Sequence, residues 1–219
     1  SAINKVLEKQ SFILGPETSE LEKKFAEYCG VKYGVGCSSG TSALFLALEA
    51  LNFKESDEVI TTPLTFIATA SAIVSARLKP VFVDVDEITY NIDANKIEQA
   101  ITKKTKAIIP VHLYGQPCDI DKIMKLAKKY NLTVIEDCAQ AHGAKFKNQK
   151  VGTFGKIGAF SFYPGKNLGA FGDAGIMITN DEKLYEILKM LRDHGRSSKY
   201  YHIMHGYNHR IDGIQSAVL

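Results

Sequence analysis

The feature that most limits the possible folds is a regular alternation of apolar runs with amphipathic segments between residues 33 and 137. The apolar runs have the length and composition of strands, and the segments between them carry apolar residues at helical spacing. Consecutive parallel strands need long crossovers of this kind. The alternation therefore predicts an α/β fold with three layers, in which a mainly parallel sheet lies between helices. The expected strands are 33–36, 58–61, 79–83, 107–111 and 132–136, and the expected helices are 37–51, 66–76, 93–101 and 119–130.

The rhythm changes after residue 137. Two further strands, 158–162 and 175–179, are joined by a Gly/Pro-rich segment without a helical pattern, so we expect them to be antiparallel and the sheet to be mixed. No linker divides the chain, and residues 1–219 are expected to form one domain, with the start and the natural end of the protein both outside it. The remaining expected elements are helices at 1–10, 16–30, 181–193 and 211–219 and a polar, aromatic loop at 197–209.

Composition excludes several classes of function. A net charge of +3 gives no reason to expect nucleic acid, and neither a membrane-spanning apolar run nor a signal peptide is present, so no membrane association is expected. The six histidines lack metal-binding spacing, and we expect no metal site. The four cysteines are scattered without Cys-x-x-Cys spacing, which favours free thiols in a reducing cytoplasm.

One lysine, Lys166, lies in the glycine-rich segment between the last two strands. Glycines there allow the backbone to turn and to approach a ligand closely. A lysine amine forms Schiff bases with carbonyl compounds, pyridoxal phosphate among them. The alternative is a mobile loop that carries an ordinary solvated lysine.

Polar side chains also follow three of the expected strands, at the edge where open α/β sheets bind ligands. The turn Ser38-Ser39-Gly40-Thr41 opens a helix, and its free N–H groups would suit a phosphate, although serine and threonine are equally common as helix caps. This turn fits neither a nucleotide P-loop nor the dinucleotide fingerprint.

Asp137 ends its strand inside the same crevice, where a carboxylate is costly to bury without a cationic partner such as a protonated pyridine nitrogen. It could also cap the next turn or pair with a lysine. Ser161 could bind the same phosphate as Thr41 or could be a small polar residue on a buried strand. Together with Lys166 these residues supply an amine, an acid and hydroxyl donors, which is the set that pyridoxal phosphate needs.

The chain resembles the DegT/DnrJ/EryC1/StrS family of sugar aminotransferases, which have the aspartate aminotransferase fold. The resemblance covers nearly the whole chain. It is carried by six stretches in family order: Ser39-Gly-Thr-Ser-Ala-Leu, Asp57-Glu-Val-Ile-Thr-Thr-Pro-Leu-Thr-Phe-Ile-Ala-Thr, Pro110-Val-His-Leu-Tyr-Gly-Gln-Pro, Glu136-Asp-Cys-Ala-Gln-Ala-His-Gly, Ser161-Phe-Tyr-Pro-Gly-Lys-Asn and Gly206-Tyr-Asn-His-Arg.

The resemblance implies roles for individual residues. Lys166 would hold pyridoxal 5'-phosphate as a Schiff base and later move a proton between the donor carbon and the cofactor. Asp137 would pair with the pyridine nitrogen, Gln140 would contact the O3′ side of the ring, and Phe66 would stack on the ring. Read without the family, Phe66 could be part of the core and Gln140 a helix cap.

The resemblance also implies how the phosphate is held. Gly40, Thr41 and Ser161 would bind it from one subunit, and Asn208 would reach the phosphate of the neighbouring subunit's cofactor. That role implies a homodimer with shared active sites. Without the family, Asn208 could simply hold a turn.

Members of this family typically transfer an amino group from L-glutamate to a nucleotide-linked keto sugar. The stretches 161–175 and 206–210 resemble most closely the enzymes that aminate C3 of a dTDP-3-keto-6-deoxyhexose, and we favour this reaction over amination at C4. Dehydratases of the family carry His in place of the lysine, so Lys166 argues against that branch. A non-catalytic regulatory protein on the same fold is the alternative from another class. The family's C-terminal small domain is expected to lie outside residues 1–219.

Overall fold

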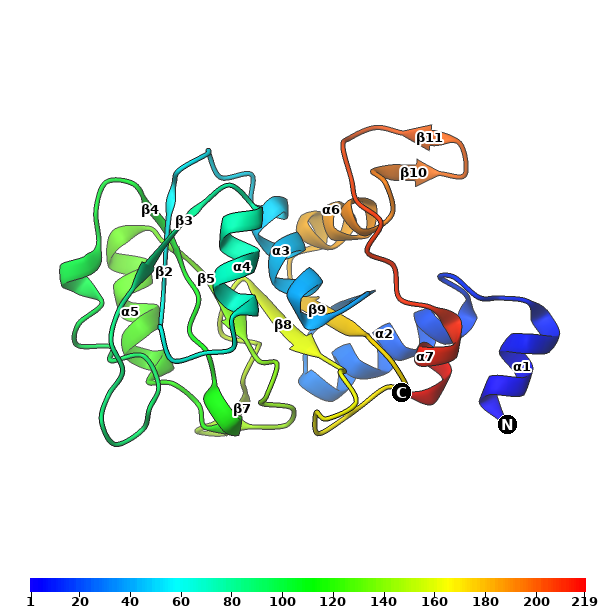
Figure 1. Ribbon diagram of the computed structural model, residues 1–219, viewed down its shortest axis with the longest axis horizontal. Coiled ribbons are helices and arrows are strands. Elements are labelled where there is room, and N and C mark those ends of the chain that lie inside the picture. Colours follow the sequence, from blue (N-terminus) through cyan, green and yellow to red (C-terminus); the bar gives the residue numbers. More distant parts are fainter.

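The computed structural model describes residues 1–219, and its centre is one seven-stranded sheet (Figure 1). Only β9 runs against its neighbours, since it pairs antiparallel with both β1 and β8 while every other pairing is parallel. The predicted mixed, mainly parallel sheet is therefore confirmed. The strands in spatial order are β1 (Tyr33–Cys37), β9 (Gly175–Thr179), β8 (Ile157–Ser161), β5 (Thr133–Asp137), β4 (Thr105–Ile108), β2 (Glu58–Thr61) and β3 (Lys79–Phe82).

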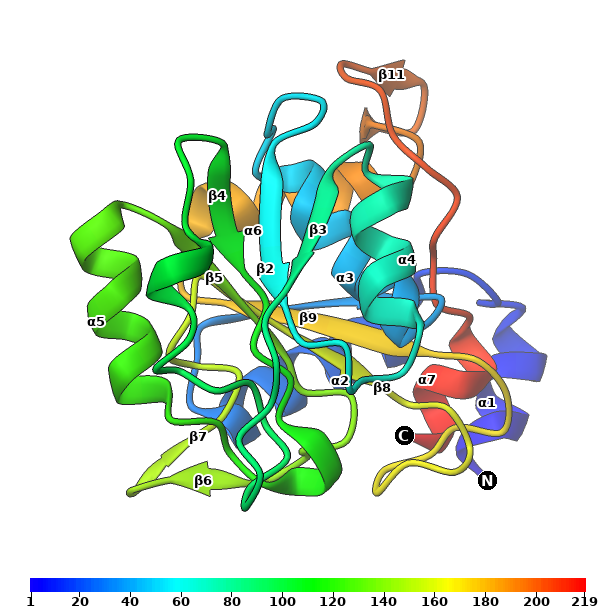
Figure 2. The same cartoon turned by 60° about the vertical axis from the view of Figure 1, so that its left-hand side comes forward.

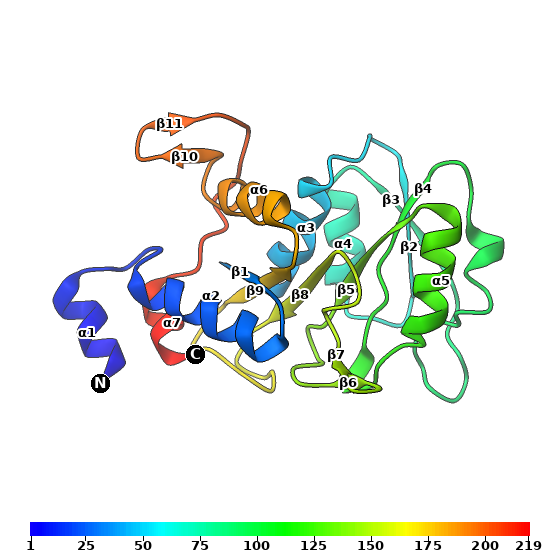
Figure 3. The ribbon, with the colours of Figure 1, turned by 180° about the vertical axis from the view of Figure 1, so that it is seen from behind.

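Helices cover both faces of this sheet, because successive strand residues point to opposite sides. Val59 of β2 packs with α3 (Gly40–Ala50), α4 (Ala68–Ser75) and α6 (Glu182–Arg192) in one apolar cluster. The next residue, Ile60, packs on the other face with α5 (Ile120–Tyr130). The helix α2 (Pro16–Cys29) covers the other end of that second face, and Figure 3 shows α2 and α5 from their own side. The predicted three-layer α/β/α arrangement is confirmed.

The helix ends follow the chemistry of their residues. Asp181 caps α6 and Asp119 caps α5 through side-chain oxygens, and Gly30 ends α2 in the left-handed conformation that favours glycine. Two shorter helices, α1 (Ala2–Lys9) and α7 (Gly213–Val218), lie together at one end of the molecule.

The expected helix at 93–101 is wrong. The segment forms turns and a short 3₁₀ helix, η1 (Glu98–Ala100), because the Asp93 carboxylate accepts both the backbone N–H and the side-chain N–H of Asn95 and so competes with helical bonding. The strand expected at 107–111 is shifted to Thr105–Ile108 as β4, and Pro110, which lacks an N–H, falls outside it.

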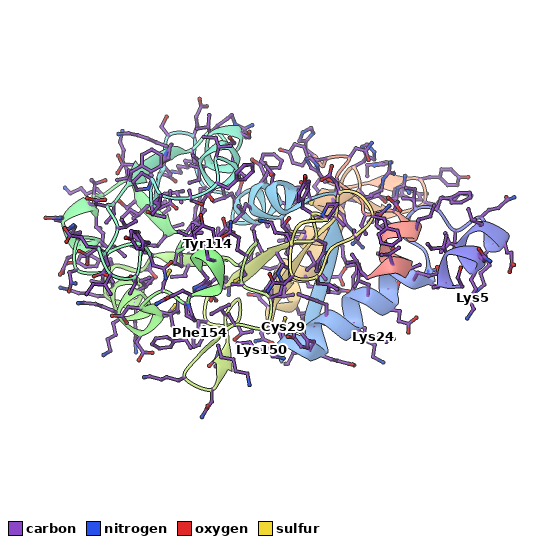
Figure 4. All side chains as sticks on the ribbon, turned by 60° about the horizontal axis from the view of Figure 1, so that its bottom comes forward. Lys5, Lys24, Cys29, Tyr114, Lys150 and Phe154 are labelled. Carbon is purple, nitrogen blue, oxygen red and sulfur yellow. The ribbon has the colours of Figure 1, made fainter.

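Two small hairpins lie outside the expected helices and strands. One joins β6 (Lys145–Phe146) to β7 (Gln149–Lys150), and Figure 4 shows Lys150 beside the end of α2, where Cys29 lies. The other joins β10 (Arg196–Ser198) to β11 (Tyr201–His202) inside the expected loop and stands away from the body of the molecule in Figures 1 and 2. No helix in the structure is both long enough and apolar enough to cross a bilayer.

The topology brings three parallel carboxyl ends to one edge of the sheet. Cys37 at the end of β1 and Ser161 at the end of β8 both lie opposite Gly175, the first residue of β9, while Asp137 at the end of β5 lies opposite Ala159. Residues that are far apart in the chain thus meet at this edge, as open α/β sheets require of a ligand site.

Candidate functional site

A cavity of about 460 Å³ opens at this edge. It is lined by every residue assigned to the cofactor from the sequence except Asn208. The lining residues include Gly40, Thr41, Phe66, Asp137, Gln140, Ser161 and Lys166, together with Ser39, Thr65, Thr69, Tyr163 and Asp173.

The turn into α3 forms the anion-binding side of the cavity. Ser39 caps the helix by accepting the N–H of Ser42, whereas the N–H groups of Gly40 and Thr41 donate to nothing in the chain. Two such N–H groups at a helix N-terminus attract a phosphate. A Cβ on Gly40 would lie 2.6 Å from Cβ of Ser161, so only glycine lets β8 approach the turn this closely. The hydroxyls of Thr41 and Ser161 flank the same space.

Asp137 lies at the deep end of the cavity with only 5% of its surface exposed. Its Oδ2 accepts a hydrogen bond from the Thr69 hydroxyl at 2.8 Å, and its Oδ1 accepts the N–H of Ala139 at 3.1 Å. Burial raises the pKa of this carboxyl above its usual value, while its hydrogen bonds and the charge of Lys166 oppose that rise. Both hydrogen-bond partners of Asp137 are uncharged, so the carboxylate has no direct cationic partner in the chain. A cation bound in the cavity would supply one.

Lys166 reaches the same cavity from the loop between β8 and β9. Its backbone N–H donates to the carbonyl oxygen of Tyr163, and Ala170 closes the loop by donating to Phe162, both at 2.8 Å. These bonds hold Lys166 within one tight turn beyond β8. Its amine forms no hydrogen bond or ion pair within the chain, which leaves it available to a ligand.

The ring of Phe66 is 68% exposed although it lines the cavity. A core role for Phe66 is therefore wrong. An exposed aromatic ring at the rim of a cavity is suited to stacking on a flat ligand.

Gln140 lines the same cavity, and no helix begins or ends next to it, so it is not a helix cap. Its Oε1 accepts the backbone N–H of Tyr114 at 2.8 Å. This bond leaves the NH₂ group of Gln140 as the free donor. Tyr114 itself has a left-handed backbone (φ 52) and an exposed side chain, which Figure 4 labels on the surface.

Asn208 is the one assigned residue that does not line this cavity. It is exposed and pairs through its backbone with Asp193, beyond the end of α6. Its role at a neighbouring subunit stays a prediction.

Thr69 belongs to the site although no role was expected for it from the sequence. Thr65 precedes α4 and Thr69 lies in its first turn; their hydroxyls are 2.9 Å apart, and Thr69 donates to Asp137. The spacing Thr-x-x-x-Thr was the available signal, but it does not reveal that α4 packs beside the end of β5.

One cluster of possible metal ligands lies behind the site, and its imidazole and carboxylate are already hydrogen-bonded within the chain. His112 Nδ1 accepts the N–H of Cys118, so its Nε2 donates to Glu136 at 3.0 Å. The carboxylate of Glu136 also accepts the N–H groups of Gly152, Phe154 and Gly155. Within the cluster of His112, Glu136 and Cys138, the hydrogen bonds of His112 and Glu136 thus tie β5 to its neighbouring loops.

The family comparison matches residues 1–219 to the DegT/DnrJ/EryC1/StrS aminotransferase family. Three curated relatives align over 99–100% of this chain. A UDP-N-acetyl-3-dehydro-alpha-D-glucosamine 3-aminotransferase of Acidithiobacillus ferrooxidans is 53% identical and is covered to 59% of its length. A dTDP-3-amino-3,6-dideoxy-alpha-D-galactopyranose transaminase of Aneurinibacillus thermoaerophilus is 51% identical and covered to 60%. A pleiotropic regulatory protein of Geobacillus stearothermophilus is 50% identical and covered to 58%.

Among solved structures, DesV of S. venezuelae in complex with a ketimine intermediate superimposes with a TM-score of 0.97 at 45% identity. The match covers 99% of this chain and 58% of that one. The chain thus spans about three fifths of the length of the proteins it matches.

Proposed function

The chain belongs to the DegT/DnrJ/EryC1/StrS aminotransferase family, and on that premise we propose that it is the cofactor-binding part of a pyridoxal-phosphate-dependent nucleotide-sugar aminotransferase. The observation that carries the proposal is the composition of one cavity. An unpaired lysine, a buried carboxylate without a cationic partner and two free N–H groups at a helix N-terminus face the same space.

These residues fit the cofactor, which supplies an electrophilic carbonyl and an electron-withdrawing ring when it is bound. The N–H groups of Gly40 and Thr41 and the hydroxyls of Thr41 and Ser161 would hold its phosphate. Asp137 would accept the pyridinium N–H, an interaction that compensates the cost of burying this carboxylate. Phe66 would stack on the ring, and the NH₂ group of Gln140 would donate to O3′.

The amine of Lys166 has two tasks in this proposal. Its Nζ would hold the cofactor covalently. When the incoming amino donor has released it, Nζ would be the base that takes up the proton of the donor's α-carbon and later returns it. The turn from Tyr163 to Lys166 fixes the backbone from which Nζ reaches the cavity, so the same amine would serve both tasks.

For the reaction, we propose transfer from L-glutamate to C3 of a nucleotide-linked keto-deoxysugar, with a dTDP-3-keto-6-deoxyhexose as the favoured acceptor. The names of two relatives, both 3-amino-sugar transaminases, support this choice; the sugar in one name is linked to UDP and the sugar in the other to dTDP. The regulatory name of a third relative supports the non-catalytic alternative, but the retained set of Lys166, Asp137 and Ser161 favours the enzyme.

We further propose that the protein acts in the cytoplasm as a homodimer with shared active sites. Four buried free cysteines support a reducing compartment. Exposed Phe66 and Ile67 beside the cavity, and Asn208 outside it, support a second subunit that covers the mouth.

The test uses the full-length protein that carries this chain. The protein is loaded with pyridoxal phosphate, and one portion is reduced with borohydride and digested to find the labelled peptide. The rest is incubated with glutamate and, separately, with each of four acceptors: the 3-keto and the 4-keto sugar, each linked to dTDP or to UDP. We expect the reduced cofactor on the peptide with Lys166 and an amino sugar from the dTDP-3-keto acceptor. Product from the 4-keto acceptors alone would refute C3 amination. A protein that labels at Lys166 but aminates no acceptor would favour the regulatory alternative.

A further inference from the structure

The anion-binding turn is fastened from behind by a histidine that does not enter the cavity. Nδ1 of His209 lies 3.1 Å from the Ser42 hydroxyl and 3.3 Å from the Ser38 hydroxyl. These two hydroxyls lie 2.9 Å apart, and the Ser39 hydroxyl lies 3.0 Å from that of Ser42. One ring nitrogen therefore organises three serines on both sides of Gly40 and Thr41.

The backbone of His209 is fixed to two parts of the fold. Its carbonyl oxygen accepts the N–H of Ser38 at 3.0 Å, and its own N–H donates to the carbonyl of Arg192, at the end of α6, at 2.9 Å. The preceding residue, Asn208, pairs with Asp193. His209 thus joins the turn to the segment that carries Asn208.

The ring of His209 packs against aromatic neighbours. Its centroid lies 5.7 Å from that of Phe45 and 6.0 Å from that of Tyr207. Burial lowers the pKa of His209, so the ring is neutral at physiological pH and has one nitrogen that accepts and one that donates.

We propose that His209 is a positioning residue for the phosphate-binding turn, and that its Nδ1, by ordering Ser38 and Ser42, holds the free N–H groups of Gly40 and Thr41 directed into the cavity. The proposal rests on the proposed function, in which these groups hold the cofactor phosphate. It extends that function by making a single residue fasten the turn through its side chain and join it to the segment with Asn208 through its backbone. A turn that is ordered before binding loses less entropy when the phosphate arrives.

Two substitutions separate hydrogen bonding from packing. His209→Asn keeps a polar atom near the position of Nδ1, and its amide supplies either a donor or an acceptor there, but it loses the aromatic contacts. His209→Phe keeps the aromatic contacts with Phe45 and Tyr207 and loses the hydrogen bonds. Loss of one or two such bonds corresponds to a roughly three- to tenfold weaker affinity.

The experiment measures dissociation constants of the cofactor-free full-length protein for pyridoxal phosphate, inorganic phosphate and pyridoxal, which lacks the phosphate. We expect His209→Phe to weaken the binding of pyridoxal phosphate and of inorganic phosphate by roughly three- to tenfold and to leave the affinity for pyridoxal unchanged. His209→Asn should retain most of the wild-type affinity for both phosphate ligands. Ser42→Ala, which removes the linking hydroxyl, is expected to reproduce the effect of His209→Phe if the latter fails to fold.

Two results would overturn the positioning role. One is wild-type affinity for both phosphate ligands in His209→Phe and Ser42→Ala. The other is an equal loss for pyridoxal, which would mean a general collapse of the cavity. If the wild-type protein itself binds neither pyridoxal phosphate nor inorganic phosphate, the proposed function fails as well, which distinguishes the two failures.

Discussion

The hydroxyl of Thr69 on α4 donates a 2.8 Å hydrogen bond to Oδ2 of Asp137 at the end of β5. The two residues are 68 positions apart in the chain, and both line the candidate site. Thr69 is fully buried and takes its place in a short chain of hydroxyls that begins at Thr65. The bond favours the ionised form of Asp137 against the effect of burial.

We therefore expect Thr69→Val to raise the pKa of Asp137 further and to lower kcat/KM at neutral pH by roughly tenfold to a hundredfold, the equivalent of one hydrogen bond to a charged group. The acid limb of the pH–rate profile should move to higher pH, because Asp137 then takes up its proton more readily. Thr69→Ser, which keeps the hydroxyl, is the matched control and should retain both the rate and the profile. An unmoved acid limb in Thr69→Val would mean that this bond does not tune Asp137.

Gly40 makes the close approach of Ser161 possible, and a substitution there tests the geometry. Gly40→Ala places a Cβ 2.6 Å from Cβ of Ser161, so we expect a loss of about 1–3 kcal/mol in the free energy of unfolding, together with weaker cofactor binding. The double variant Gly40→Ala with Ser161→Gly removes the clash and should recover most of that stability. Additive losses in the double variant, measured by denaturant unfolding, would contradict the close contact between the turn and β8.

His142 predicts a pH dependence of stability. Both ring nitrogens lack partners, the ring packs against Phe25, Phe160 and Phe162, and burial lowers its pKa from 6.5 to about 4. A histidine with a depressed pKa binds fewer protons folded than unfolded, so its contribution to stability is present above the unfolded pKa and is lost as the pH falls from 6.5 towards 4.

Unfolding of the cofactor-free protein should therefore become easier over this range, by at most about 1.4 kcal/mol per pH unit from His142. His142→Phe fits the aromatic surroundings and should flatten the dependence. A variant that loses stability with falling pH as steeply as the wild type would assign the effect to other groups.

Asn208 tests the proposed shared site. Lys166→Ala and Asn208→Ala should each reduce activity strongly in a homodimer, because each site would take its lysine from one subunit and its asparagine from the other. In a mixed sample unfolded and refolded together, half of the dimers are heterodimers with one intact site, so activity should return to about a quarter of the wild-type value. Each variant refolded alone is the control. Absence of recovery in verified heterodimers would place Asn208 outside the partner's site.

Much of this fold follows from local patterns. Strand–helix alternation predicted the layers, and the absence of a helical pattern between residues 162 and 175 predicted that β9 runs against β8. The positions of Asp137 and Ser161 at strand ends predicted that they share one edge with the turn at Gly40, since parallel strands end together. Local competition by the Asp93 side chain defeated the helix expected at 93–101.

The sequence by itself thus determined the layers and the edge that carries the site, and together with the family resemblance it gave seven of the sixteen residues that line the cavity. Tertiary structure alone decided which partners these residues have. The bond from Thr69 to Asp137, the exposed ring of Phe66 at the cavity and the contact of His209 with Ser42 each join segments whose separation along the chain carries no local signal. Packing of helices against a sheet sets such contacts, and the periodicity of a segment reports only which of its faces is buried.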